Sequence, residues 1–351
     1  MPTLKKDVLH EVTAAIFRAT GAPDDLAVQV ADVLVDNHLA GHDSHGILRI
    51  PEYVQSVRTG EIVATARPRV LEESATSALV SGNWAFGQVT GVFAADLAVE
   101  KAKRERVSVL SVVQAAHTGR LAAFTERAAR QNVAMFMAIG TVGRPITAPY
   151  GGSAPVLGTN PVSFSIPNPG GPPVTLDFAT STIAAGKINL AKARHEPLPP
   201  DAILDRHGRP STDPQAFFEG GCLLPFGKHK GYALAVIAEL LSGPLAGADA
   251  YPGITSRSGI FIFAVDAALF RPLADYEKAL AKTLGRIKAV PPGLGFEEVL
   301  LPGEPEARAR VQREADGISI PEDTWQAVCK VGAELGVNVE AMATVEARPS
   351  P

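Results

Sequence analysis

Cysteine is scarce in this chain of 351 residues, which contains only Cys222 and Cys329. The two lie far apart with no second cysteine near either, so we expect neither a disulfide framework nor a cysteine-ligated metal site. Long apolar runs are also missing. No uninterrupted run exceeds the seven residues of Val133 to Ile139, whereas a membrane-spanning helix needs about 18. The N-terminus lacks the apolar core and cleavage site of a signal peptide. We therefore predict a cytoplasmic protein without a membrane partner.

A strong charge of one sign is missing as well. The chain carries 33 basic and 37 acidic side chains, for a formal net charge of −4, and has no block of like charges. This balance excludes the basic footprint of a nucleic-acid-binding protein. Apolar residues make up 46% of the chain, enough for a sizeable core. With about 100 to 200 residues per domain as a guide, the length predicts two domains or one large one.

The common nucleotide and metal motifs are absent too. There is no G-x-G-x-x-G after a predicted strand, no G-x-x-x-x-G-K-[ST] and no H-E-x-x-H. Three histidines, His38, His42 and His45, lie at three- and four-residue spacing, but Gly41 interrupts them, so no metal site is predicted. What the chain has in quantity is 32 glycines and 28 prolines. Turns and irregular segments should therefore be abundant.

Apolar periodicity divides the chain into helical ends and a mixed centre. Spacings of three and four residues predict helices within the first 60 residues, the third of them over Ile47 to Val57. Short apolar runs then predict strands over 77–80, 107–113, 133–139, 162–166, 174–178 and 260–265. Helices are predicted between these strands over 89–106, 121–131 and 230–241, and after them over 307–315 and 322–335. The pattern indicates an α/β or α+β fold whose terminal helices pack together.

The densest polar cluster runs from Gly41 to Tyr53. A helix beginning near Gly46 places Arg49 and Tyr53 on one face, with His45 at its start. An imidazole exchanges protons near neutral pH, and a guanidinium pairs with a carboxylate, so the cluster suits an acidic substrate. Ordinary capping by Asp43 or Ser44, with Arg49 in a surface ion pair, explains the same residues equally well.

Four further segments are candidates for a site, each with a plainer structural explanation beside it. His117 to Arg120 joins a predicted strand to a helix, where α/β proteins bind ligands, although such a histidine is more often structural. Gly151 to Pro161 is either a pocket wall or a plain turn. The segment from Leu176 to Ser181, which begins in the predicted strand 174–178 and runs on to Gly186 and Lys187, is the candidate that comes next in the chain. Gly227 to Tyr232 precedes an apolar helix, so it fits either a phosphate or a solvated basic turn.

Taken in order, these segments resemble the malate/L-lactate dehydrogenase family that lacks a Rossmann domain. That family also includes ureidoglycolate dehydrogenase, diketogulonate reductase and piperideine-carboxylate reductase. The resemblance extends from about Asp7 to about Pro302. Seven short motifs carry it in the family's order: Asp43-Ser44-His45-Gly46 with Arg49 and Tyr53, His117-x-Gly119, Ala148-Pro149-x-Gly151-Gly152, Leu157-Gly158-Thr159-Asn160-Pro161, Asp177-Phe178-Ala179-Thr180-Ser181 with Gly186-Lys187, Asp205-x-x-Gly208-x-Pro210-x-Thr212-Asp213-Pro214, and Lys230-Gly231-Tyr232.

The resemblance implies a fold and an activity. It implies a central mixed sheet over 69–303 that binds NAD or NADP in a non-Rossmann manner, with a helical domain formed by 1–68 and 304–351. It further implies a homodimeric oxidoreductase that transfers a hydride between the nicotinamide and a small 2-hydroxy or 2-oxo acid. A reductase of cyclic imino acids is the alternative, and a non-catalytic ligand-binding paralogue is a third possibility.

The resemblance also implies residue roles. Arg49 binds the substrate carboxylate, with Tyr53, Thr159 and Asn160 as further substrate contacts. The catalytic set is Ser44, His45, His117 and Lys187. In it, His45 exchanges the proton, although in some members the histidine matching His117 does so. Lys187 favours hydroxy-acid over imine chemistry, because imine reductases of the family place an aspartate nearby. The implied cofactor residues are His117, Thr118, Gly119, Arg120, Leu121, Thr141, Asp177, Phe178, Ala179, Lys230, Gly231, Pro302, Gly303 and Arg308.

Overall fold

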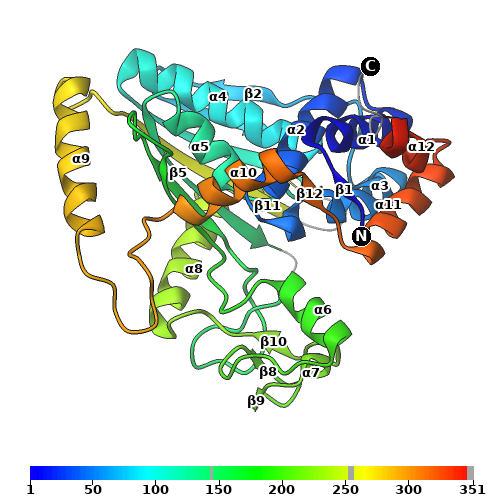
Figure 1. The fold of residues 1–351 in the computed structure, drawn as a ribbon. Helices are drawn as coiled ribbons and strands as arrows, with labels where there is room; N and C mark the ends of the chain where they lie inside the picture. Colours follow the sequence, from blue (N-terminus) through cyan, green and yellow to red (C-terminus); the bar gives the residue numbers. More distant parts are fainter. Residues whose placement is uncertain (143–144, 252–256, 346–351) are drawn as a thin grey trace.

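A seven-stranded sheet forms the centre of the computed structural model, which describes residues 1–142, 145–251 and 257–345 (Figure 1). The strand order is β2-β3-β4-β11-β5-β6-β7. All neighbouring strands are antiparallel except β3 and β4, which are parallel. The mixed sheet confirms the predicted fold class. Its strands are β2 (Arg69–Glu73), β3 (Ser77–Ser81), β4 (Val107–Ala115), β5 (Val133–Val142), β6 (Val162–Ile166), β7 (Val174–Phe178) and β11 (Arg257–Asp266).

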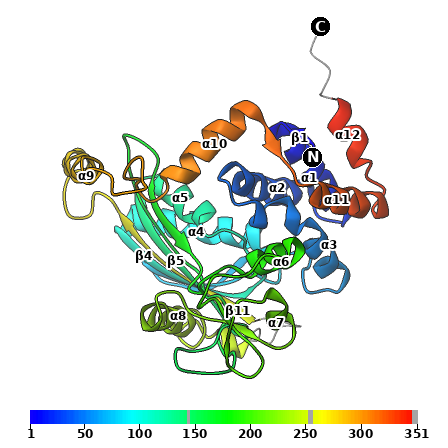
Figure 2. The same ribbon diagram turned by 60° about the horizontal axis from the view of Figure 1, so that its bottom comes forward.

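Helices cover both faces of the sheet, because consecutive strand residues point to opposite sides. In β5, Met137 belongs to the core under α4 (Gly87–Glu105) and α5 (Ala122–Ala129), whereas Ala138 belongs to a small cluster under α8 (His229–Ser242). Figure 2 shows α4 and α5 on one side of the sheet and α8 on the other. All three helices agree with the predicted ranges to within a few residues.

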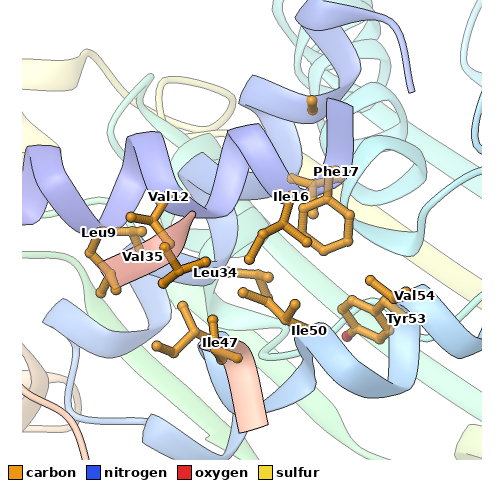
Figure 3. Packing of buried hydrophobic residues seen from close by; sticks show 14 of the residues in the cluster. Leu9, Val12, Ile16, Phe17, Leu34, Val35, Ile47, Ile50, Tyr53 and Val54 are labelled. Atoms are coloured by element: carbon orange, nitrogen blue, oxygen red, sulfur yellow. The ribbon is translucent and has the colours of Figure 1, made fainter. Parts of the chain in front are cut away.

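The two ends of the chain pack into one helical layer beside the sheet. Its elements are β1 (Thr3–Leu4), α1 (Lys6–Ala19), α2 (Asp24–Leu39), the 3-10 helices η1 (Asp43–His45) and η2 (Ile47–Arg49), α3 (Ile50–Arg58), α10 (Glu304–Asp316), β12 (Ile318–Ser319), α11 (Glu322–Glu334) and α12 (Val339–Val345). Strand β1 pairs with β12. Ile16, Leu34 and Ile50 share a buried cluster (Figure 3) that also includes Val328 near the other end of the chain. The boundaries at 68 and 303 stay predictions.

The third predicted helix is split. Residues Ile47 to Arg49 form a separate 3-10 turn, and α3 begins only at Ile50 with Pro51 in its first turn, the position that a proline tolerates. This break matters for the site, because it separates Arg49 from the helix that carries Tyr53.

Two further regions surround the sheet. Short strands β8 (Ile203–Leu204), β9 (Pro210–Ser211) and β10 (Cys222–Leu223) form a second small sheet beside α6 (Ala185–Arg194) and α7 (Pro214–Phe218). The short η3 (Ala248–Ala250) lies against β11 and β4 of the central sheet. Helix α9 (Leu273–Lys288) was not predicted. It stands apart from the body (Figure 1), and none of its residues is buried. Among the described residues, no helix has the length and apolar character needed to cross a membrane.

Candidate active site

The turn between α2 and α3 carries the first group of predicted site residues. Gly41, with φ of +82°, ends α2 in a conformation that favours glycine. The two 3-10 helices then follow, joined at Gly46. They place Ser44, His45 and Arg49 close together, so the predicted grouping of imidazole and guanidinium exists, although on a 3-10 turn instead of one regular helix.

His45 lies between Ser44 and His117. Its Nδ1 is 3.0 Å from the Ser44 hydroxyl, and its ring stacks on that of His117 with centroids 6.0 Å apart. The Asn37 amide fixes the backbone by donating to the His45 carbonyl over 2.9 Å. Burial, followed by the charges of His117 and Arg49, lowers the pKa of His45 to about 3. The imidazole is therefore neutral at physiological pH.

Arg49 uses two of its donors within the turn. Nε donates to the Ser44 carbonyl over 2.8 Å, and Nη1 donates to Glu52 over 2.6 Å. The ion pair with Glu52 is the surface pairing that we also expected if the cluster only caps a helix. A carboxylate ligand would thus meet a guanidinium that is already oriented. Fewer of its N–H groups would be available to that ligand than in an arginine without protein partners.

Tyr53 and His117 are joined by a short hydrogen bond. The Tyr53 hydroxyl is 2.7 Å from Nδ1 of His117, and Nε2 of Gln88 is 3.0 Å from the same hydroxyl. Tyr53 is only 1% exposed, so it holds His117 in position from within the core. Burial raises the pKa of the Tyr53 phenol well above its usual range, which keeps the hydroxyl protonated.

The segment after β4 forms a buried charge cluster. Arg120 is 3% exposed. Its Nη2 donates to Glu126 over 2.5 Å, while Asp36 and Asp177 each lie 3.8 Å from other nitrogens of the guanidinium. The Asp177 carboxylate also accepts from the backbone N–H of Ala122. Burial outweighs the attraction of Arg120 and raises the pKa of Asp177 to about 6. The cluster thus ties β7 to the loop before α5.

Several buried polar side-chain atoms in and around this loop have no hydrogen-bond partner among the residues that the structure describes. They are Thr118 Oγ1, Arg120 Nε and Nη1, Asn37 Oδ1 and Gln88 Oε1. Gly119, with φ of +87°, lies between Asn37 and Gln88. Unpaired buried donors and acceptors are costly unless water or a ligand completes them. Because these atoms lie together around the loop, a polar ligand bound there would supply their missing hydrogen-bond partners.

The start of α8 and the end of β7 also adjoin each other. The Phe178 and Phe226 rings contact edge to face, with centroids 5.2 Å apart. A Cβ on Gly231 would lie 2.1 Å from the Phe226 carbonyl, so only glycine allows this close approach of helix and loop. Lys230, one residue earlier, is exposed, and Ala179 is partly buried. Leu121 is buried at the beginning of α5.

Other predicted residues lie elsewhere or make structural contacts. The Asn160 amide donates to the Ala235 carbonyl and to Glu239, so its side chain holds the loop against α8. The Thr159 carbonyl accepts from Thr180. The side chain of Thr141 lies outside the part of the chain that the structure describes.

The remaining segments approach the site from two sides. A Cβ on Gly186 would lie 3.7 Å from Cβ of Ser44. The start of α6, with the exposed Lys187 beside it, therefore adjoins the turn that carries Ser44, His45 and Arg49. Pro302 accepts from the Thr175 N–H, which brings the 302–303 loop next to β7. Gly303 adopts φ of +92° there. Arg308 forms an exposed ion pair with Glu298.

Comparison with known proteins decides the family. The family model described as malate/L-lactate dehydrogenase matches residues 4–329, nearly the whole chain. The chain belongs to the malate/L-lactate dehydrogenase family. This confirms the resemblance drawn from the seven motifs.

Relatives in this family cover almost the full chain. The chain is 33% identical to hydroxycarboxylate dehydrogenase B of Escherichia coli (strain K12) over 342 residues, which is 95% of this chain and 94% of that protein. The structure resembles sulfolactate dehydrogenase from Methanocaldococcus jannaschii with a TM-score of 0.88 at 33% identity, covering 97% of this chain and 99% of the other. It resembles Δ1-piperideine-2-carboxylate reductase from Pseudomonas syringae with a TM-score of 0.82 at 28% identity, covering 94% and 100%. The chain is accordingly an oxidoreductase.

Four residues of this family member that contact the site were not predicted from sequence. They are Asn37, His38, Gln88 and Arg313. The first three are fully or almost fully buried polar residues on helices whose other inward positions are mostly apolar, a pattern that the sequence does show. Arg313 carries no comparable signal, because nothing local relates it to the turn. Among the described residues, no group of three or more His, Cys, Asp or Glu side chains is placed to hold a metal ion.

Proposed function

We propose that the chain is an NAD- or NADP-dependent dehydrogenase that oxidises a small 2-hydroxy acid of the malate or lactate type and catalyses the reverse reduction. One observation carries the proposal: the stacked pair of His45 and His117 beside the turn of Arg49. The pair offers proton exchange next to a cation for the substrate carboxylate, as oxidation of a hydroxy acid requires.

The hydrogen bonds around His117 fix its tautomer. Nε2 of Gln88 faces the carbonyl of Thr118 at 3.2 Å and that of His117 at 3.5 Å, and carbonyls only accept, so this end of the amide is the donor. It donates to the Tyr53 oxygen as well. The Tyr53 hydroxyl then donates to Nδ1 of His117, and a neutral His117 carries its hydrogen on Nε2. We infer that this chain of hydrogen bonds orients the His117 ring beside His45 at the site.

His45 has no such constraint, because a serine hydroxyl both donates and accepts. To accept a proton at Nε2, the neutral His45 must carry its hydrogen on Nδ1 and donate it to the Ser44 hydroxyl. The imidazolium that forms donates from Nδ1 to Ser44 in the same way. His45 therefore moves between both protonation states without losing its partner. In the oxidative direction His45 takes the hydroxyl proton at Nε2, and in the reductive direction it returns it. The low pKa favours the neutral, proton-accepting form.

Arg49 is the proposed carboxylate ligand, oriented by the Ser44 carbonyl. Thr159, Asn160 and Lys187 stay predicted contacts on the same side. Since Asn160 uses its amide donors on α8, its Oδ1, which has no hydrogen-bond partner among the described residues, would be the atom that contacts the substrate.

The residues predicted to hold the dinucleotide fit such a group. The unpaired polar atoms of Thr118 and Arg120, the positive φ of Gly119 and the close approach at Gly231 form a polar, glycine-lined path from His117 towards α8. Bound there, a nicotinamide dinucleotide would supply the hydride acceptor or donor. Asp177, Phe178, Ala179, Lys230 and the 302–308 segment would line the remainder of the path.

We also propose a homodimer, in keeping with the family resemblance, formed through the sheet face that α8 leaves uncovered. Val109, Phe263, Phe136, Phe164 and Leu176 are cross-strand partners in one row over five strands. All except the more buried Phe136 are 37 to 39% exposed. An uncharged apolar row of this length is typical of a surface that meets another copy. The cytoplasmic location stays a prediction.

The experiment is spectrophotometric. The purified protein is incubated with NADH or NADPH and a panel of 2-oxo acids that includes oxaloacetate and pyruvate, and absorbance is followed at 340 nm. Consumption of reduced cofactor with at least one acid is expected. If none of the oxo acids reacts with either cofactor, the proposal is wrong.

A reductase of cyclic imino acids is the second candidate, favoured by the similarity to the piperideine-carboxylate reductase structure. Including Δ1-piperideine-2-carboxylate in the same panel separates the two. A higher kcat/KM for the imine than for every oxo acid would establish the second candidate.

A further inference from the structure

The turn that carries Ser44, His45 and Arg49 has little structure of its own. Each of its two 3-10 helices contains three residues, and such short turns have few internal hydrogen bonds. The turn must therefore be held from outside if its side chains are to keep catalytic geometry, and the question is which residues hold it.

The ring of His38 lies directly beneath the turn. It is 1% exposed, and a Cβ on Gly46 would lie 2.2 Å from its Cδ2, so the chain at Gly46 rests on the imidazole. Nε2 of His38 accepts from the Ile47 N–H over 3.0 Å. Nδ1 must then carry the hydrogen of the neutral ring, and it donates to Asp43 over 2.9 Å. The ring thus connects the two ends of the turn.

Asp43 is in turn held by Arg313 of α10, a residue 270 positions away in the chain. Both terminal nitrogens of Arg313 donate to the Asp43 carboxylate, Nη1 to Oδ1 and Nη2 to Oδ2. Nη1 also donates to the His38 carbonyl over 2.6 Å, at the C-terminal end of α2, where helix carbonyls lack intrahelical partners. One guanidinium therefore clamps the end of α2 and the first residue of the turn together.

Helix α10 is itself fixed against α2. Arg310 pairs with Asp36 over 2.8 Å, Glu306 is 3.3 Å from His42, and a Cβ on Gly41 would lie 3.4 Å from Cβ of Ala309. Arg313 therefore belongs to a helix whose position relative to α2 is fixed by several contacts. The same helix begins at Glu304, directly after the loop beside β7.

From this geometry we propose that Arg313 is a positioning residue for His45. It acts through Asp43 and His38 and touches neither substrate nor cofactor. The proposal rests on the proposed function, since it assigns to Arg313 the placement of the proton-exchanging group. Without Arg313, Asp43 and the His38 carbonyl lose their shared donor, the turn gains freedom, and His45 leaves the position in which it meets the substrate hydroxyl.

The test compares Arg313→Met, which keeps the length of the side chain but no donor, with Arg313→Lys, which keeps the charge and part of the hydrogen bonding. Arg58→Met is the control, because Arg58 forms an ion pair of similar reach with Glu334, between α3 and α11. We expect Arg313→Met to lower kcat by about 10- to 100-fold, as small misplacements of reacting groups do. The dinucleotide Kd should stay within about threefold, Arg313→Lys should recover part of the kcat, and Arg58→Met should match the parent.

A second measurement is independent of turnover. The rate of diethyl pyrocarbonate modification of His45, followed by peptide mass spectrometry, should rise several-fold in Arg313→Met and not in Arg58→Met. If kcat and this rate both stay within twofold of the parent in Arg313→Met, or in Arg313→Leu should the Met variant not fold, Arg313 has no positioning role. Absence of turnover in the parent with every acid would refute the proposed function, and the modification rate would then decide the positioning role alone.

Discussion

The Tyr53 hydroxyl lies 2.7 Å from Nδ1 of His117, with the Gln88 amide on its other side at 3.0 Å. The three groups form a chain that runs from the amide through the phenol to the imidazole. In the proposed arrangement, a neutral His117 carries its hydrogen on Nε2. The two stacked histidines have different partners, a tyrosine for His117 and a serine for His45.

Tyr53→Phe should release this tautomer. The ring remains to fill the core, so the loss of stability is about 2 kcal/mol, because two hydrogen bonds of the buried hydroxyl are lost. Turnover should fall about tenfold or more, because His117 loses the hydroxyl that orients its ring. Tyr276→Phe is the control, since the Tyr276 hydroxyl bonds only the remote Pro167 carbonyl among the contacts described. Steady-state kinetics and thermal unfolding check both, and equal kcat values for the two variants would contradict the assigned role.

His45→Asn should nearly abolish turnover and leave dinucleotide affinity almost unchanged, because it removes the proton acceptor and retains a polar side chain. Steady-state assays and fluorescence titration with NADH measure the two effects. If His117→Asn abolishes turnover and His45→Asn does not, the proton is exchanged by His117 instead.

The low pKa of His45 also predicts how stability depends on pH. The folded pKa of about 3 lies below the unfolded value of about 6.5, so between these values the unfolded chain binds the extra proton. The cost to folding grows as pH falls below 6.5 and reaches about 2 kcal/mol at pH 5. Chemical unfolding at pH 7 and pH 5 should therefore show a smaller loss for His45→Asn than for the parent. Equal losses in both proteins would mean that His45 titrates normally.

Arg49→Lys should raise KM for the acid with a smaller change in kcat, because a lysine has no second planar donor for a carboxylate. The ammonium also cannot reproduce the Nε bond to the Ser44 carbonyl. Arg58→Lys, at the other end of α3, provides the control for a charge-conserving change on a neighbouring segment. An unchanged KM in Arg49→Lys would remove Arg49 from the carboxylate site.

Phe164→Glu should convert a dimer into monomers, since it places a charge within the exposed apolar row. Light scattering coupled to size-exclusion chromatography measures the mass. Phe218→Glu, at a similarly exposed phenylalanine away from the row, should leave the mass unchanged. A parent protein of monomer mass would overturn the proposed assembly.

Much of this molecule follows from the sequence alone. Apolar alternation and spacing predicted the strands at 107–113 and 133–139 and the helices of α4, α5 and α8, because each depends on which side of a local element is buried. The family followed from seven short motifs, because glycine turns and polar clusters at fixed order are hard to replace. Helix α9 was missed although Leu273, Leu280 and Ile287 recur at helical spacing, so here the signal was present in the sequence.

Only the tertiary structure decided how the site is held. The tautomer of His117 depends on Gln88, the charge cluster of Arg120 on Asp36 and Asp177, and the catalytic turn on Arg313, which lies 270 residues from Asp43. Likewise, Asn160 is directed to α8 by two acceptors that its own segment does not contain. Such pairings arise when separate elements pack, and no local spacing encodes them. The sequence therefore determined which chemical groups the site contains, and packing determined their partners, their protonation and their direction.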